Sequence, residues 1–298
     1  MPFLGNWKLG HRFNLGLLWS LLAGVGLLTY LAIAEDRRNV EYVLSVRQAT
    51  QDAERVKQLA GSPSGIPATG AVTLLQNDPL TQGPRLFSRQ CASCHRFDGH
   101  DGMGLVSTNA PEAPDLKNFA SREWIAGMLD PEQISGPHYF GGTKFKDGKM
   151  AKFVKKDVAQ FTAEEKEQLK KAIIALSAEA ELKAQRDADK RDEAIILEGR
   201  KLLAGSSMHC ADCHQFHKVD EDANAPDLTG YGSHQWLTEI IANPAHAKFY
   251  GKKNDRMPAF GENKIMDPHS IDLLTKWLRG DWYVPEKIAA ESGTEGSR

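Results

Sequence analysis

Two short stretches decide the fold: residues 91–95 read CASCH and residues 210–214 read CADCH. The same landmarks follow each stretch in the same order, namely an APDL string (113–116, 225–228), a tryptophan (124, 236) and an aromatic pair before glycine (139–141, 249–251). A solenoid would repeat every ~20–50 residues, and this repeat is longer. We therefore expect two copies of one domain, at residues 83–180 and 181–285.

Composition narrows the class of protein. The 298 residues include 37 Lys+Arg against 39 Asp+Glu, a formal charge of −2, and 41% are hydrophobic. Such values are ordinary for a globular chain. Because positive and negative charges nearly balance, the chain has no overall positive electrostatic potential, and we expect no nucleic-acid partner. Four cysteines are too few for a disulfide scaffold in a chain of this length.

Each copy is expected to end in a helix. Residues 162–165 form a capping box before apolar residues at helical spacing. Asp267 and Pro268 supply an N-cap and an N1 proline before a second such run. The charged stretch 178–193 is expected to bridge the copies as a helix or linker. No segment alternates between apolar and polar residues with period two, so the sequence predicts an all-α protein.

The N-terminus carries a candidate membrane helix. Residues 13–34 contain no charge and would span about 33 Å as a helix, enough for a hydrocarbon core of ~30 Å. A cleaved signal peptide is the alternative, but its apolar region is only ~7–15 residues long. We therefore expect an uncleaved membrane anchor at 1–34. A helical neck and linker at 35–82 and a disordered tail at 286–298 complete the layout.

Cys-x-x-Cys-His is the pattern of covalent attachment of c-type haem. Two thiols three residues apart lie on one side of a helical turn, where each can form a thioether to a porphyrin vinyl group, and the adjacent histidine faces the iron. A thioredoxin-type pair would need a βαβ setting, and a four-cysteine zinc site would need both pairs in one domain. The sequence thus predicts two covalently bound haem c groups, held by Cys91, Cys94 and His95 and by Cys210, Cys213 and His214.

Methionine is the expected sixth iron ligand in each copy. Met257 lies in a loop before the final helix, and Pro258 stiffens the exit of that loop. Met150 occupies the corresponding loop of the first copy, and the alternative for both is a gap-filling core methionine. His/Met ligation raises the reduction potential and leaves no vacant iron position. This favours electron transfer, and we expect no enzyme activity of the chain on its own.

Each copy resembles a class I cytochrome c domain, over residues 83–177 and 195–280. In that family a proline carbonyl accepts the Nδ1–H of the haem histidine, and Pro114 and Pro226 stand at the matching place. The resemblance implies that the first helix of each domain packs against its own last helix. It also allows Trp124 and Trp236 to donate an indole N–H to a haem propionate, with a core aromatic as the equal alternative.

The stretch 10–36 resembles the last transmembrane helix of cytochrome b or subunit IV in bacterial cytochrome bc complexes. This resemblance implies a dihaem cytochrome c subunit of a quinol–cytochrome c oxidoreductase. Its partners would be cytochrome b and Rieske iron–sulfur subunits, with a soluble cytochrome or terminal oxidase as acceptor. The dihaem subunit of a cbb-type oxidase, a dihaem cytochrome c peroxidase and a free-standing anchored electron shuttle are the alternatives.

The chemistry of haem attachment predicts where the protein lies in the cell, and the distribution of lysines predicts a docking surface. Haem is coupled to cytochrome c outside the bacterial inner membrane, which implies a single-pass protein with a cytoplasmic N-terminus and periplasmic haem domains. Lysines surround both ligand loops, at 144–156 and at 248–264. One of these clusters is expected to dock an acidic partner, unless it is only a solvated surface.

Overall fold

The computed structural model describes residues 8–219, 223–254 and 256–285. Its regular structure within these ranges is helical, with isolated β-bridges around Phe97. The prediction of an all-α protein is therefore confirmed. The chain forms two compact units, Met1–Gly65 and Ile66–Arg298. The predicted tail at 286–298 lies outside the described residues.

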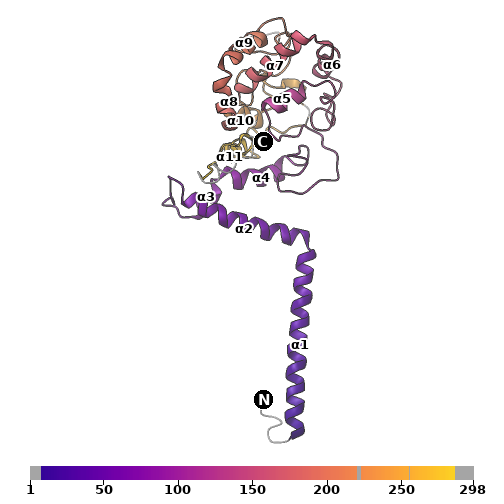
Figure 1. Cartoon of the computed structure of the whole chain (residues 1–298), viewed down its shortest axis with the longest axis vertical. Helices are drawn as coiled ribbons and strands as arrows, with labels where there is room; N and C mark the ends of the chain where they lie inside the picture. Colours follow the sequence, from indigo (N-terminus) through magenta and orange to yellow (C-terminus); the bar gives the residue numbers. More distant parts are fainter. Residues whose placement is uncertain (1–7, 220–222, 255, 286–298) are drawn as a thin grey trace. The chain divides into compact units, whose positions relative to one another are not determined.

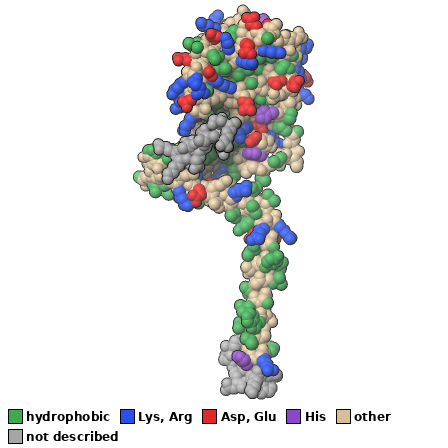
Figure 2. Space-filling model, in the orientation of Figure 1, with side chains coloured by type: hydrophobic (Ala, Val, Ile, Leu, Met, Phe, Trp, Pro, Cys, Tyr) green, Lys and Arg blue, Asp and Glu red, His purple; other side chains and the backbone are tan. Residues whose placement is uncertain are grey.

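Two helices, α1 (Lys8–Arg38) and α2 (Val40–Ala60), make up the first unit. Asn39 separates them because its extended backbone interrupts the helix, and its side chain accepts the Tyr42 N–H at 3.1 Å. Within the described residues, one stretch is long and apolar enough to cross a membrane, Gly10–Arg38. Figure 2 shows the hydrophobic side chains along this helix. The predicted helical neck is the end of α1 together with α2.

The second unit contains the other helices of the described chain (Figure 1). They are, in chain order, α3 (Val72–Gln76), α4 (Pro79–Gln90), α5 (Arg122–Met128), α6 (Lys149–Lys156), η1 (Val158–Gln160), α7 (Ala163–Ala178), η2 (Lys183–Gln185), α8 (Arg186–Arg191), α9 (Glu193–Ala204), α10 (His234–Ala242), η3 (Gly251–Lys253) and α11 (Pro268–Arg279). The predicted bridge at 178–193 is formed by η2 and α8.

Capping residues explain where several of these helices begin. Thr162 and Glu165 form the predicted capping box of α7, and Asp267 accepts the Ser270 N–H at 2.8 Å at the start of α11. Asp78 plays the same role for α4, accepting the Thr81 N–H at 3.1 Å ahead of an N1 proline. The predicted linker is therefore wrong in its last part, which already belongs to α3 and α4.

The pairing of helices between the two copies is exchanged. α4 packs against α11, and α9 packs against α7, as Figure 1 shows. A Cβ atom at Gly83 would lie 2.1 Å from Cβ of Trp277, and one at Gly199 would lie 2.2 Å from the Lys171 carbonyl oxygen. Each first helix thus lies on the last helix of the other copy. The pairing within each copy that the resemblance implied is wrong.

Side-chain volume accounts for the exchange. α11 carries Trp277, whose indole covers the groove that Gly83 leaves on α4, and α7 has no aromatic residue to fill it. Gly199 on α9 instead faces the small Ala175 on α7. A Cβ atom at position 199 would lie 2.6 Å from the Cβ atom of Ala175. The short connection through α8 also keeps α7 and α9 close in sequence.

One hydrophobic core runs through both copies, from Phe87 and Trp124 to Trp236 and Trp277. Equivalent positions meet inside the unit: a Cβ at Gly232 would lie 2.2 Å from that of Ala120. The first copy also has a small second cluster beneath α6, made of Ile134, Ala151, Val154 and Val158. The two copies are therefore interlocked, although their local elements repeat.

Candidate functional site

Both Cys-x-x-Cys-His stretches fold into a single turn. The His95 N–H donates to the Cys91 carbonyl at 2.8 Å, and the His214 N–H donates to the Cys210 carbonyl at 3.0 Å. In the first copy the turn continues directly from α4, because Cys91 is the residue that ends this helix. In the second copy α9 ends at Ala204, so a short segment precedes the turn.

The two histidines are oriented by backbone carbonyls. His95 Nδ1 lies 2.7 Å from the Pro114 oxygen, and His214 Nδ1 lies 2.6 Å from the Pro226 oxygen. The hydrogen bonds predicted for both prolines are therefore present. A carbonyl can only accept, so Nδ1 carries the proton and Nε2 keeps its lone pair.

Burial reinforces the neutral form of both rings. It lowers the pKa of His95 and of His214, and the prolyl carbonyls oppose this only in part. Neither Nε2 has a hydrogen-bond partner among the described residues. Each imidazole thus presents Nε2 as a basic nitrogen, which is the form that an iron ligand needs.

The four cysteines are partly buried, and no disulfide joins them. Burial, with Cys94 nearby, raises the pKa of Cys91 to about 12, and burial, with Asp212 nearby, raises that of Cys210 to about 11. Across the described ranges, no three His, Cys, Asp or Glu side chains are grouped as a metal site. The described chain therefore lacks the four-cysteine group of the zinc alternative, and its helical elements lack the βαβ setting of a thioredoxin-type pair.

Matching backbone hydrogen bonds tie each APDL string to its haem-attachment turn. The Cys94 carbonyl accepts the N–H groups of Glu112 and Ala113 at 3.0 and 3.1 Å. The Cys213 carbonyl accepts those of Asn224 and Ala225, both at 3.1 Å. This frame holds the prolyl oxygen against the histidine in both copies, so the repeat seen in the sequence extends to the local geometry.

Two buried charged residues of the first copy were not predicted. Asp115 accepts the backbone N–H groups of Asp98 and Gly99 at 3.0 and 2.8 Å, which closes the loop after the motif. Arg96 donates to the carbonyls of Ala92 and Asn109 at 2.6 and 2.8 Å. The sequence signal for Asp115 was the aspartate shared by both APDL strings. Arg96 had no such signal, because glutamine stands at the equivalent position.

The two tryptophans are core aromatics. The Trp124 indole N–H donates to the Asp115 carbonyl at 3.1 Å, and that of Trp236 donates to the Asp227 carbonyl at 2.9 Å. Both rings are buried. An indole has a single N–H donor, and here a backbone oxygen takes it in each copy. These contacts favour the core role, and the propionate role expected for these residues stays a prediction.

The predicted methionine ligands have different surroundings. Met257 lies in a loop and packs against the main core, and Asn254 Nδ2 donates to its carbonyl at 2.9 Å. Met150 is the second residue of α6 and packs against the small cluster beneath this helix. The loop expected around Met150 is wrong, because Ala151 and Val154 give this stretch a buried helical face. Iron ligation by both methionines stays a prediction.

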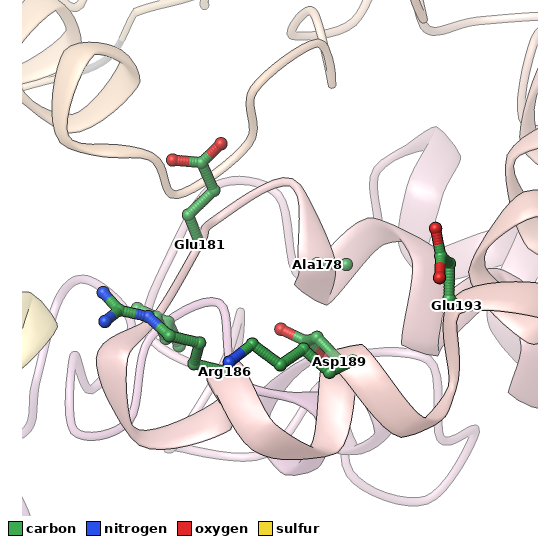
Figure 3. Close-up of a pocket in the computed structure, with 7 residues that line it drawn as sticks. Ala178, Glu181, Arg186, Asp189 and Glu193 are labelled. Atoms are coloured by element: carbon green, nitrogen blue, oxygen red, sulfur yellow. The ribbon is translucent and has the colours of Figure 1, made fainter.

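A separate cleft of about 490 Å³ lies at the connection between α7 and α9 (Figure 3). Its lining consists of Ala178, Glu181, Leu182, Arg186, Asp189, Lys190 and Glu193. Asp189 is already paired with Arg122, at 2.7 Å. Acidic and basic side chains border the cleft, and it contains none of the predicted haem residues. It is therefore not the candidate site.

Comparison with known proteins identifies the first of the two copies. Residues 80–173 match the family model described as "Cytochrome c". No curated protein and no solved structure matches the chain significantly. The matched segment includes the first motif, Pro114 and Met150. Domains of this family bind haem c covalently and transfer electrons. The chain therefore contains a cytochrome c domain at residues 80–173, and with it covalently bound haem c and a role in electron transfer.

Proposed function

We propose that the protein is a membrane-anchored dihaem cytochrome c, with the second haem on Cys210, Cys213 and His214. The observation that carries the proposal is the repeated histidine–carbonyl hydrogen bond, at 2.7 Å in the first copy and 2.6 Å in the second. The second copy repeats the turn, the carbonyl frame and the buried neutral imidazole of the family-matched first copy. A haem would have the same attachment residues in both.

When bound, haem c supplies an iron that changes between the ferrous and ferric states. His95 and His214 offer Nε2 as one axial ligand each, and the prolyl carbonyls set the orientation and basicity of these rings. Met150 and Met257 are the proposed second axial ligands. Thioether sulfur stabilises the reduced state and leaves no open coordination position, so the proposed role is electron transfer without catalysis.

Within the membrane, we propose that the chain serves as the cytochrome c subunit of a quinol–cytochrome c oxidoreductase. The apolar α1 and the resemblance of residues 10–36 to the last helix of cytochrome b or subunit IV support this assignment. Electrons would arrive from a Rieske centre and leave to a soluble cytochrome or terminal oxidase. α1 would anchor the chain in the bacterial inner membrane, with the haem domains in the periplasm.

The α6 surface is the proposed docking site for an acidic electron-transfer partner. Exposed lysines line this helix, and Lys149, Lys152 and Lys156 lie on the side that faces away from the buried Ala151 and Val154. None of Lys149, Lys152, Lys155 and Lys156 forms an ion pair with another described residue. In the other cluster, Lys248 is neutralised by Glu239 at 2.7 Å. The first cluster is therefore the stronger candidate.

Purification of the full chain from its native membrane in mild detergent tests the proposal. We expect two haems per chain by pyridine haemochrome assay, two low-spin spectra with a methionine–ferric band, and co-elution with a b-type cytochrome and an iron–sulfur subunit. Co-elution with a copper-containing oxidase would point to the cbb-type alternative. A high-spin haem that reacts with peroxide would point to a peroxidase, and a single haem would contradict the dihaem proposal.

A further inference from the structure

An aromatic cluster joins the two repeated loops inside the core. The Phe119 ring lies 4.7 Å from the Trp124 ring in an edge-on arrangement, and 6.1 Å from the Trp236 ring in a stacked one. Phe119 thus contacts the tryptophan of its own copy and that of the other copy. Tyr231, its equivalent in the repeat, lies 5.4 Å from Phe119 and 5.0 Å from Trp236.

Each tryptophan is tied to the backbone beside a haem histidine. In the first copy, Trp124 bonds the Asp115 carbonyl at 3.1 Å, and the preceding carbonyl, of Pro114, accepts His95 at 2.7 Å. In the second copy the equivalent bonds are 2.9 Å for Trp236 with Asp227 and 2.6 Å for Pro226 with His214. Consecutive carbonyls of one rigid backbone therefore hold the indole and the imidazole.

From these contacts we infer that Phe119 is a positioning residue for both histidine sites. Close packing fixes the two indoles against its ring, and each indole fixes the carbonyl next to the one that orients a histidine. A change at position 119 therefore alters both histidine–carbonyl hydrogen bonds. The inference rests on the proposed second haem. It adds that one residue, Phe119, influences both histidine sites, which the repeat alone does not imply.

Two neighbouring rings provide matched controls, because each contacts one tryptophan of the pair. Tyr139 lies 5.4 Å from Trp124, and Phe249 lies 5.2 Å from Trp236. Both are buried in the same core as Phe119. A substitution at Phe249 removes similar ring packing from the second site and leaves the packing of Trp124 in place.

The test compares reduction potentials of the full chain in detergent. In Phe119→Leu, loosened hydrogen bonds make both histidines less basic, so we expect the midpoint potentials of both haems to rise. In Phe249→Leu we expect one potential to rise, which also assigns it to the second site. Phe119→Tyr keeps the ring and is expected to retain both wild-type potentials.

Several results would overturn the inference. Two bound haems with one shifted potential, or none, in Phe119→Leu would show that position 119 does not serve both sites. Two shifted potentials in Phe249→Leu would assign the effect to general loosening of the core. Phe119→Met, with a longer and more adaptable side chain, replaces the leucine variant if that variant does not fold. A chain that binds one haem would contradict the proposed function itself, and this inference with it.

Discussion

Gly83 on α4 lies directly against Trp277 on α11, where a Cβ atom at position 83 would be 2.1 Å from Cβ and 2.2 Å from Cγ of the tryptophan. These atoms are next to the α11 backbone and cannot swing aside as the end of a flexible side chain would. The contact joins the first helix of one copy to the last helix of the other. The exchanged pairing therefore requires a residue without a Cβ atom at position 83.

We predict that Gly83→Ala destabilises the protein by about 1–3 kcal/mol through overpacking. Thermal or urea unfolding of the chain measures this loss. Gly61→Ala is the control, because a Cβ there meets ordinary contacts at 3.5 and 3.6 Å. In a double-mutant cycle with Trp277→Gly, which removes both Cβ and Cγ of the tryptophan, we expect the two effects to be non-additive. Additive effects would contradict the exchanged pairing.

Gly199→Ala tests the other exchanged contact. A Cβ at this position would lie 2.2 Å from the Lys171 carbonyl oxygen and 2.6 Å from the Ala175 Cβ. We expect a loss of about 1–3 kcal/mol in unfolding free energy. Ala175→Gly is expected to recover part of the loss by removing one of the two clashes. It is not expected to rescue Gly83→Ala, and a rescue there would favour pairing within each copy.

Short-range features of the site could be predicted from the sequence, whereas the helix pairing could not. The hydrogen bonds of His95 and His214 follow from motifs with fixed spacing, and the structure contains both. The exchanged pairing depends on how Trp277 and Gly83 fit, while α7 and α11 both present apolar faces at helical spacing. Sequence patterns predict buried faces, but they do not say which of two similar faces a helix covers.

Other differences between prediction and structure came from local signals. α4 begins at an Asp-Pro pair like the one used to predict α11, and the glycine- and proline-rich context obscured it. The lysine-rich stretch around Met150 looked like a loop, although Ala151 and Val154 have helical spacing. For Trp124 and Trp236 the sequence left two roles open, since the choice depends on which acceptor reaches the indole N–H.

Removal of one cysteine pair is expected to remove one haem. We predict that Cys210→Ser with Cys213→Ser lowers the haem content from two per chain to one, because the thioethers of the second copy cannot form. Haem staining after denaturing electrophoresis and a pyridine haemochrome assay give the count. The matched variant, Cys91→Ser with Cys94→Ser, is expected to give the same count. An unchanged count in the first variant would show that the second motif carries no haem.

The N-cap of α11 predicts a pH dependence of stability. The Ser270 N–H bond lowers the pKa of Asp267 from its usual value of 3.8. The stabilisation is therefore complete above that value and is lost as the pH falls through the lowered folded-state pKa. Asp267→Ala is expected to cost about 1 kcal/mol at pH 7, and Asp267→Asn to keep the cap without the acid dependence. Unfolding curves at pH 7 and pH 3 check both expectations.

Charge on α6 is expected to control the rate of reaction with an acidic electron-transfer partner. Lys152 and Lys155 are exposed residues of α6, and Lys152 lies on the opposite side of the helix from the buried Val154. We predict that Lys152→Glu with Lys155→Glu slows second-order electron transfer and weakens its dependence on ionic strength. Lys166→Glu with Lys170→Glu on α7 is the control, since it makes the same change of net charge at exposed lysines away from α6. Stopped-flow reduction at low and high salt measures the rates, and equal slowing by the control would assign the effect to net charge instead of the α6 surface.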